Sequence, residues 1–440
     1  MNALAEEANK VLDGSAAGRL LSGLGRRMYF PKGILTQSAE AGVKAKRFNA
    51  TIGMAYEGGE PMILDAVRAA LPGLSASEAV AYASTGGVAE LRQRWKLELA
   101  RKNPSLASRS YSLPVVVPGL TAAVSYLADL FLDEGDAVVL PDLHWPNYRL
   151  IVEERKQATG LTFPVFAAGG AGGALGFNVA GMAERLAEAG AKRGKAVCIL
   201  NFPNNPTGYS PTETEAEAIV SALVAEAEKG TDILVIADDA YFGLQYERNL
   251  LGESIFARLT DAHPRILTVK ADGPTKEDYV WGFRLGFVTF AGKDLSEARQ
   301  EALVKKLMGV VRSSVSSSSA PAQNIFLKAL DSPGYEAQKR RYRELLEGRF
   351  REAKKAVSSG GMPASLRALP FNSGYFMSFE CRGISAEALR VKLLEERGIG
   401  TISMQDRYLR VAFSSVEEGG IAELYREIAA AAVALEDAGR

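Results

Sequence analysis

The sequence predicts an α/β fold in which a mostly parallel sheet lies between layers of helices. From about residue 85 to residue 290, segments with a helical period alternate with short runs rich in β-branched residues. This alternation is typical of parallel strands that are joined by helices and covered by them on both faces. The predicted strands are residues 115–117, 137–140, 196–200, 233–236, 266–269 and 285–290.

Several of these predicted strands are followed directly by polar or glycine-containing motifs. The motif at 119–121 follows the first strand, Asn205 follows the third, Asp238 the fourth and Lys276 the fifth. Ligands of open α/β sheets bind at the carboxyl ends of the strands. The sequence therefore predicts a site at this edge of the sheet.

A long helix is predicted for residues 334–357, where it joins a large domain to a smaller one. Beyond it, residues 374–380 and 409–413 have the pattern of strands, with helical patterns between and after them. The first sixty residues are expected to fold back onto this part. The predicted division is an N-terminal segment at 1–64, a large domain at 65–333 and a small α/β domain at 334–440.

The composition is that of a globular protein that acts on small molecules. The 440 residues are 47% hydrophobic and 24% charged, which is ordinary for a chain of two domains. Lys plus Arg and Asp plus Glu number 52 each, so no excess charge favours a nucleic acid or a membrane surface as partner. The N-terminus is acidic and no apolar run reaches the roughly 18 residues of a membrane span, so we expect a cytoplasmic protein.

Three other kinds of site are not expected from the sequence. Cys198 and Cys381 stand in apolar runs without metal-ligand spacing, which predicts buried free thiols and no metal. Neither His144 nor His263 lies near a nucleophile motif, so a Ser-His-Asp mechanism is not expected. The glycine-rich run 169–174 lacks the spacing of a nucleotide-binding loop and predicts a surface loop.

Lys276 and Arg284 are eight residues apart and suggest a phosphorylated aldehyde as ligand. An amine that is partly unprotonated can form a Schiff base with an aldehyde, and a nearby guanidinium can hold a phosphate. Three upstream motifs, each at the end of a predicted strand, give this pair its context: Asn201-Phe-Pro-Asn-Asn205-Pro-Thr-Gly208, Asp238-Asp239-Ala240-Tyr241, and Lys270-Ala-Asp-Gly273 leading into Lys276.

Taken together, these motifs resemble the class I pyridoxal-phosphate-dependent aminotransferases, and in particular their aspartate/aromatic branch. The resemblance covers roughly residues 48 to 415. It implies fold type I of the pyridoxal-phosphate-dependent transferases, with a large and a smaller α/β domain, and a homodimer with sites at the interface. It also implies pyridoxal 5'-phosphate as the cofactor and Lys276, Asp238 and Tyr241 as catalytic residues.

The resemblance assigns residues to the cofactor ring. Asp238 matches the acid that keeps the pyridine nitrogen protonated, since the family's acid stands three residues before the tyrosine, which selects Asp238 over Asp239. Asn205 and Tyr241 match the donors to the phenolic oxygen, and Trp145 matches the aromatic residue that stacks on the ring.

It also assigns residues to the cofactor phosphate, which binds well at a helix N-terminus. The residues implied are Gly119, Leu120, Thr121, Thr275 and Arg284, together with Tyr82 from the partner subunit. The family often has a serine three residues before the lysine, and this sequence has Gly273 there. One phosphate hydrogen bond is therefore expected to be missing or replaced.

Three residues match the family's substrate contacts. Arg410 matches the arginine that binds the substrate α-carboxylate in a bidentate fork, and Gly53 matches a loop that closes over the substrate. Arg312 falls where an arginine of the partner subunit binds the distal carboxylate of aspartate or glutamate, and a surface or structural arginine is the alternative.

The predicted function is transfer of an amino group between an L-amino acid, such as aspartate, glutamate or an aromatic amino acid, and a 2-oxo acid such as 2-oxoglutarate. A pyridoxal-phosphate-dependent lyase or amino-acid decarboxylase on the same fold is the alternative. A regulator fused to a DNA-binding domain would need a further basic helix-turn-helix pattern, and the sequence does not show one.

Overall fold

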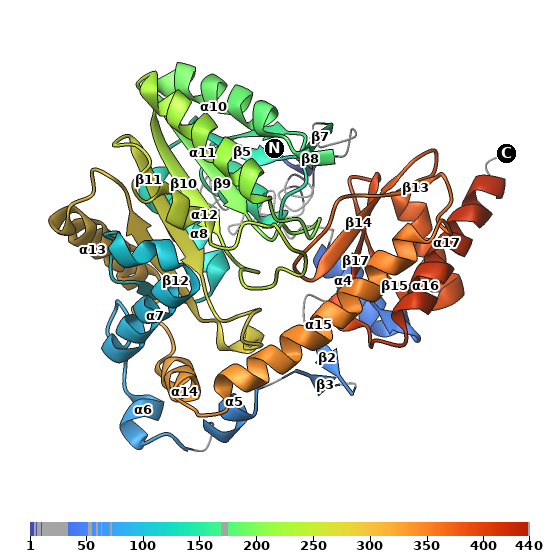
Figure 1. Ribbon diagram of the computed structural model, residues 1–440, viewed down its shortest axis with the longest axis horizontal. Coiled ribbons are helices and arrows are strands. Elements are labelled where there is room, and N and C mark those ends of the chain that lie inside the picture. The colour runs from blue at the N-terminus through green and yellow to red at the C-terminus, as the bar shows by residue number, and fades with distance from the viewer. Residues whose placement is uncertain are drawn as a thin grey trace.

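The protein is described here by a computed structural model, which describes residues 1–3, 6, 10, 34–51, 55–58, 60–62, 64–70, 73–168 and 175–438. Gly53 and the glycine-rich run 169–174 lie outside the described residues. A large central sheet and a second, smaller sheet organise the chain, and the long helix α15 (Tyr335–Ser358) runs between them (Figure 1). Among the described residues, no helix is both long and apolar enough to cross a membrane.

The central sheet has seven strands within the described ranges. Five of them, β6, β5, β9, β10 and β11, run parallel to one another, whereas β12 is antiparallel to both β11 and β4. The strands, in order across the sheet, are β4 (Val115–Val117), β12 (Gly286–Ala291), β11 (Ile266–Asp272), β10 (Asp232–Asp238), β9 (Lys195–Asn201), β5 (Ala137–Pro141) and β6 (Thr159–Phe163).

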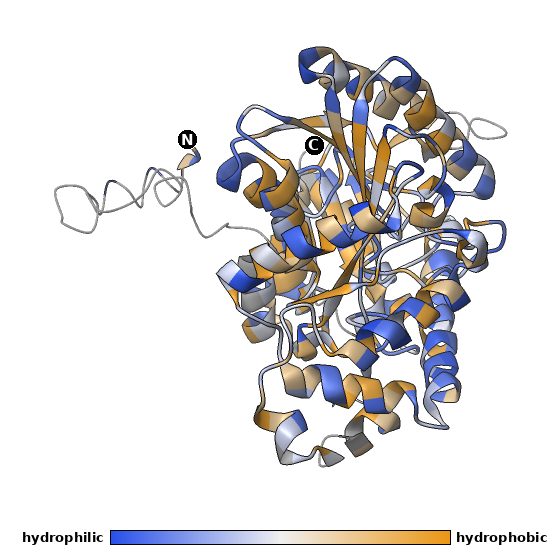
Figure 2. Cartoon of the chain, turned by 90° about the vertical axis from the view of Figure 1, so that its left-hand side faces the viewer, coloured by the Kyte–Doolittle hydropathy of each residue, from blue (hydrophilic) through white to orange (hydrophobic). Residues whose placement is uncertain are grey.

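Helices cover both faces of this sheet because its strands are apolar on both sides. Val139 and Cys198 face the core that α10 and α11 cover, whereas the adjacent Val138 and Val197 face the core that α8 and α13 cover. Figure 2 shows the strands in orange beside helices whose outer faces carry blue residues. The helices of this part are α7 (Ala89–Lys102), α8 (Leu120–Phe131), α10 (Val179–Arg193), α11 (Glu213–Glu228), α12 (Ile255–Leu259), α13 (Glu297–Ser314) and α14 (Ala320–Leu330).

Local sequence sets where some of these helices begin. At the start of α11, the Thr212 hydroxyl accepts a hydrogen bond from the Glu215 amide, and the Glu215 carboxylate accepts one from the Thr212 amide. This capping box satisfies two backbone donors that have no partner inside the helix. Gly119 caps α8 with a φ of 86°, a conformation that favours glycine.

The second sheet is antiparallel and is covered by α15, α16 and α17, which share a core with it. The N-terminal part joins this unit, because β1 (Phe48–Asn49) pairs with β15 (Ile399–Gly400) and α4 (Ile34–Lys44) packs beside it. The elements are β13 (Leu366–Ala368), β14 (Phe376–Cys381), β17 (Tyr408–Ala412), β16 (Ile402–Met404), α16 (Ala386–Arg397) and α17 (Ile421–Ala438).

The predicted α/β fold is confirmed, and each of the six predicted strands is present with ends that differ by a few residues. The edge strand β6 was not predicted. Its sequence contains Gly160 and two threonines, and its residues alternate between exposed and buried, so the apolar run that marks the other strands is missing.

Candidate active site

One cavity lies at the carboxyl ends of the central strands, where the motifs predicted a site. Residues from the start of α8 and from the ends of β5, β9, β10 and β11 meet there. Of the predicted residues, it is lined by Leu120, Thr121, Trp145, Asn205, Asp238, Tyr241, Thr275, Lys276 and Arg284. The structure therefore brings residues that are more than 160 positions apart in sequence to a single site.

Asp238 is the last residue of β10 and is 3% exposed. Its Oδ2 accepts a hydrogen bond of 2.5 Å from the hydroxyl of Tyr148, and its Oδ1 accepts one of 3.2 Å from the amide of Ala240. Burial raises the pKa of Asp238 to about 6, although the Tyr148 hydrogen bond acts in the opposite direction. The site thus holds a buried carboxylate that gains from a cationic partner.

The adjacent Asp239 faces away from the cavity, because side chains alternate at the end of a strand. Its Oδ2 pairs with the ammonium group of Lys270, which is fully buried, and accepts a 2.5 Å hydrogen bond from Ser254. Lys270 also lies 3.7 Å from Oδ2 of Asp272. Asp239 and Lys270 therefore belong to a buried ion cluster and not to the cavity lining.

Lys276 extends into the cavity beside Tyr241, with Nζ 5.5 Å from the centroid of the tyrosine ring. Burial lowers the pKa of Lys276 to about 8, and the positive charges of Arg284 and Arg410 lower it further, while Asp238 opposes them. At pH 7 roughly a tenth of the amine is therefore unprotonated, far more than in a lysine with an ordinary pKa. An amine in this state can attack an aldehyde.

Asn205 connects the cavity to the second sheet. Its side-chain oxygen accepts a 3.1 Å hydrogen bond from Nη1 of Arg410, and Nη2 of Arg410 donates to the carbonyl of Thr51 at 3.1 Å. The amide of Asn205 donates to the side chain of Asn201, which in turn donates to the carbonyl of Asp238. Asn201 thus fixes both motifs relative to each other.

Arg410 lies over the ring of Phe376, 4.3 Å from its centroid, and is 3% exposed. Burial lowers its pKa to about 10. In the part of the chain that the structure describes, its Nε has no hydrogen-bond partner, and its other two nitrogens donate to amide oxygens and not to a carboxylate. A buried cation in this state has an unmet demand for an anion.

Arg284 approaches the N-terminus of α8 so closely that a side chain at residue 119 would displace the guanidinium. A Cβ on Gly119 would lie 2.5 Å from Nη2 of Arg284. The start of α8, with its backbone amides, and the Arg284 guanidinium therefore lie together at the cavity, where they could bind a phosphate. Thr275 lies at the same end of the cavity, where its hydroxyl donates to the carbonyl of Leu285 at 3.4 Å.

Gly273 stands where the resemblance implies a serine, and a serine there would require a backbone shift. A Cβ there would lie 2.7 Å from the carbonyl oxygen of Leu285 and 3.1 Å from Cα of Gly286. The close approach of β12 to this loop explains why the sequence departs from the usual pattern at this position.

The donor set fits pyridoxal phosphate. An amine, a buried carboxylate, two donors near it and a phosphate cradle at a helix N-terminus line the same cavity, and each matches one group of that molecule. The unsatisfied Nε of Arg410 leaves a demand for a further anion next to the cavity.

Gly119 and Arg410 lie beside the cavity lining, against Arg284 and Asn205, whereas Tyr82 and Arg312 are not part of the lining. The side chain of Tyr82 is 94% exposed, and Arg312, near the end of α13, is exposed and donates to Ser316 at 2.9 Å. Gly53 lies outside the described residues.

Sequence reasoning missed Tyr148, Asn201 and Tyr375. Tyr148 stands three residues after Trp145 on a helical turn, a spacing that places both side chains on one face, and this could have been noticed. Tyr375 donates a 2.8 Å hydrogen bond to the carbonyl of Lys276 from 99 residues away, and no local pattern indicates that contact.

The sequence profile of the family described as "Aminotransferase class I and II" matches residues 53–428. Among curated proteins, a probable N-acetyl-LL-diaminopimelate aminotransferase of Bacillus subtilis is 24% identical over 342 residues, 76% of this chain and 77% of that protein. An aspartate aminotransferase of the same organism is 27% identical over 255 residues, 57% of each chain.

Solved structures of aminotransferases share the fold over nearly the whole length. An aminotransferase from Anaerococcus prevotii has a TM-score of 0.80 at 24% identity, covering 92% of this chain and 97% of that chain. A kynurenine aminotransferase of Pyrococcus horikoshii, solved with PMP, has a TM-score of 0.78 at 18% identity, covering 95% and 98%.

These comparisons confirm the predicted family, fold class and cofactor, and they favour transamination over the lyase or decarboxylase alternative. The chain belongs to the class I and II aminotransferases, a family of pyridoxal-phosphate-dependent enzymes.

Proposed function

We propose that this enzyme transfers an amino group from an L-amino acid to a 2-oxo acid, with 2-oxoglutarate as an acceptor and dicarboxylic amino acids among its donors. The observation that carries the proposal is the state of Arg410. Among the described residues, this buried guanidinium donates to Asn205 of the cavity lining and to the carbonyl of Thr51, both amide oxygens, and its Nε has no hydrogen-bond partner. The α-carboxylate of an amino acid would supply the missing anion.

The proposed cofactor contacts follow from the chemistry of the donors. Asp238 would hold the proton on the pyridine nitrogen, Asn205 and Tyr241 would donate to the phenolic oxygen, and Trp145 would cover the ring. Arg284 and Thr275, with Gly119, Leu120 and Thr121 at the start of α8, would hold the phosphate. All except Gly119 line the one cavity, and Gly119 lies against Arg284, which supports the assignment.

When bound, pyridoxal phosphate supplies an electron sink for the electrons released when the substrate Cα–H bond breaks. Lys276 would hold the cofactor and then move the proton at Cα, which requires an amine that titrates near the working pH. Its pKa of about 8, lowered by burial and by Arg284 and Arg410, meets this requirement. Arg410 would orient the substrate by its α-carboxylate, and Asn205 would hold Arg410 in place.

We further propose a homodimer in which Tyr82 contacts the cofactor phosphate of the partner subunit and Arg312 contacts the distal carboxylate of its substrate. Both side chains are exposed and neither lines the cavity of its own chain, which is compatible with this arrangement. Gly53 would belong to the segment that covers the substrate. The proposed location is the cytoplasm.

The proposed division into units at 1–64, 65–333 and 334–440 is supported by the contacts of the N-terminal part. The pairing of β1 with β15 and the packing of α4 beside β15 attach that part to the C-terminal unit. The break at 333 lies just before α15.

A half-reaction experiment tests the proposed activity. The purified holoenzyme is mixed with one amino acid at a time, without an acceptor, and conversion of the bound cofactor from its aldehyde to its amine form is followed by absorbance. We expect conversion with glutamate and aspartate, and return to the aldehyde form with 2-oxoglutarate. Release of ammonia or carbon dioxide without formation of the amine form would instead indicate a lyase or a decarboxylase.

A further inference from the structure

The two residues Lys276 and Glu277 are adjacent in sequence but point into different parts of the molecule. Lys276 lines the cavity, whereas the side chain of Glu277 extends toward α7 and α15. A backbone hydrogen bond of 3.0 Å from the amide of Asp278 to the carbonyl of Pro274 closes the turn that carries both residues. A shift of the Glu277 side chain would therefore also shift the backbone of Lys276, because both residues lie in this closed turn.

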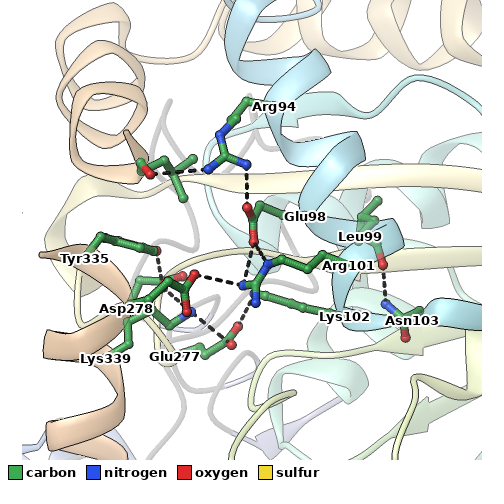
Figure 3. Close-up of polar contacts among 12 residues, drawn as sticks. Arg94, Glu98, Leu99, Arg101, Lys102, Asn103, Glu277, Asp278, Tyr335 and Lys339 are labelled. Atoms are coloured by element: carbon green, nitrogen blue, oxygen red, sulfur yellow. Dashed lines mark hydrogen bonds and ion pairs between the residues drawn. The ribbon is translucent and has the colours of Figure 1, made fainter. Parts of the chain in front are cut away.

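Glu277 bridges two lysines from distant parts of the chain. Its Oε2 lies 2.5 Å from Nζ of Lys102 at the end of α7, and its Oε1 lies 3.0 Å from Nζ of Lys339 in the first turns of α15 (Figure 3). The three side chains are only 11–16% exposed. Burial alone would raise the pKa of Glu277, but the two ammonium groups lower it, so the carboxylate is ionised.

Asp278 strengthens the same anchor from the next position. Its Oδ1 lies 2.6 Å from Nζ of Lys339 and accepts a hydrogen bond from the hydroxyl of Tyr335, the first residue of α15. The turn after Lys276 is thus attached to α15 by two carboxylates that share one lysine (Figure 3).

The two helices that carry Lys102 and Lys339, α7 and α15, are also joined directly by an ion pair. Arg101 of α7 pairs with Glu98 at 2.7 Å and with Glu336 of α15 at 3.0 Å. The ends of α7 and α15 therefore form one frame beside the turn, which limits how far Lys102 and Lys339 can move relative to each other.

The Glu277 carboxylate also lies against the segment that carries Tyr241. Gly243 has a φ of 92°, and a Cβ there would lie 2.6 Å from Oε1 of Glu277. Only a residue without a side chain allows this approach. Glu277 thus contacts the backbone two residues after Tyr241 while it anchors the backbone of Lys276.

We propose that Glu277 is a positioning residue for Lys276, because its bridge to Lys102 and Lys339 fixes the turn that carries the amine relative to Asp238 and Tyr241. This inference rests on the proposed function, in which Lys276 is the residue that holds the cofactor. Glu277 itself does not line the cavity, so it acts through the backbone and not by contact with a ligand.

The groups that face Lys276 determine what a loss of position does to its amine. Burial and the positive charges of Arg284 and Arg410 lower the pKa of Lys276, and Asp238 raises it. Glu277→Gln would leave these charges in place but would release the turn, so the amine would become more hydrated. We expect its titration midpoint to move up toward that of an ordinary lysine. A pure charge effect has the opposite sign, since loss of a carboxylate leaves excess positive charge.

Two measurements on the full-length chain test the inference. In the cofactor-free protein, the rate of acetylation of Lys276 is followed against pH by peptide mass spectrometry. In the holoenzyme, the absorbance of the bound cofactor is titrated with pH, and kcat and KM are determined separately. For Glu277→Gln we expect a higher midpoint for Lys276, a fall in kcat of roughly tenfold or more, and a smaller change in KM.

Glu226→Gln is the matched control. Glu226 is also a buried, paired glutamate, with Lys229 at 2.9 Å and Thr231 at 2.7 Å, but it lies at the end of α11, before β10 begins. Glu226 therefore lies near the amino-terminal end of β10, whereas the cavity is at the carboxyl ends of the strands. We expect this variant to lose stability without a change in the Lys276 midpoint or in kcat.

The double variant Glu277→Gln/Lys102→Met separates position from stability. Removal of both members of a buried pair avoids the unpaired charge that destabilises the single variant. We expect the melting temperature to recover while the Lys276 midpoint stays shifted. If the single variant does not fold, Lys102→Met alone serves, since it removes half of the bridge.

An unchanged Lys276 midpoint and kcat in Glu277→Gln, or recovery of both together with stability in the double variant, would overturn the inference. Failure of the proposed function looks different. In that case, borohydride reduction of the wild-type holoenzyme would leave the cofactor label on a residue other than Lys276.

Discussion

Tyr148 donates a 2.5 Å hydrogen bond to Oδ2 of Asp238, whereas the next carboxylate, Asp239, pairs with Lys270 on the other side of the strand end. The two adjacent acids are therefore distinguished by their partners, one neutral and one cationic. A cation bound in the cavity would therefore still stabilise the charge of Asp238, whereas the charge of Asp239 is already balanced by Lys270.

Asp238→Asn should abolish amine transfer and weaken cofactor binding while the fold is retained. In the proposed arrangement, this substitution would remove the charged partner of the pyridine nitrogen from a desolvated site, which typically costs about 3–5 kcal/mol. The measurement is cofactor affinity by fluorescence titration, together with the single-turnover rate with glutamate.

Asp239→Asn should act mainly on stability. It leaves the buried Lys270 without its close partner, so we expect a loss of about 3–5 kcal/mol in the free energy of unfolding. Urea denaturation of the cofactor-free chain measures this loss. Equal losses of single-turnover rate in the two folded variants would contradict the assignment of Asp238, and not Asp239, as the acid that acts on the cofactor.

The amine of Lys276 should titrate near pH 8, because burial, Arg284 and Arg410 lower its pKa from that of a free lysine. Only the unprotonated amine reacts, so its acetylation rate in the cofactor-free chain should rise through pH 8 and level off above it. Lys305, which is 71% exposed, provides the internal reference for the reagent.

The same titration has a signed counterpart in Asp238→Asn. The negative charge of Asp238 raises the pKa of Lys276, so its removal should move the midpoint to lower pH. A midpoint that moves upward, or Lys276 labelling that follows Lys305 at every pH, would contradict the electrostatics described for the cavity.

Gly119→Ala should weaken cofactor binding, because the new Cβ would lie 2.5 Å from Nη2 of Arg284. Displacement of one guanidinium that binds a phosphate typically costs about 1.5–3 kcal/mol, or roughly tenfold to a hundredfold in affinity. Equilibrium dialysis with pyridoxal phosphate and with inorganic phosphate measures the loss at the phosphate cradle itself.

Gly194→Ala is the control for backbone strain. Gly194 also has a positive φ, 64°, but a Cβ there would have no heavy atom within 4 Å among the described residues. It should lower stability by about 1 kcal/mol and leave cofactor affinity unchanged. Similar losses of affinity in both variants would show that strain, and not the contact with Arg284, is responsible.

The sequence predicted the central sheet and the cavity lining well because both depend on short-range patterns. Apolar runs mark β9, β10 and β11, and a motif at the end of each strand must lie at the same edge of a parallel sheet. Asn205, Asp238 and Lys276 could be placed together without knowledge of any long-range contact.

The residues that hold this lining in place could not be predicted in the same way. Tyr375 reaches the carbonyl of Lys276 across 99 residues, and Lys339 reaches Glu277 across 62. Tyrosine and lysine are common, and neither stands in a distinctive local pattern, so only the packing of the second sheet and α15 against the turn shows these contacts. Gly273 could not be explained from the sequence either. The backbone that leaves no room for a side chain there is that of Leu285 and Gly286, and only the structure shows that it lies against Gly273.

Arg312→Ala should reduce kcat/KM for aspartate and glutamate while leaving that for phenylalanine nearly unchanged. Arg410 would bind the α-carboxylate of all three substrates, whereas Arg312 from the partner subunit would bind only a second carboxylate. Loss of such a charge-assisted pair should cost roughly 2–5 kcal/mol in transition-state binding for the dicarboxylates. Arg299→Ala is the matched control, since Arg299 is an exposed arginine on the same helix whose partner is Asp294. If all three substrates are affected equally, or if none is, the second carboxylate must be recognised by another residue, because a side chain that contacts only the distal group cannot alter turnover of a substrate that lacks it.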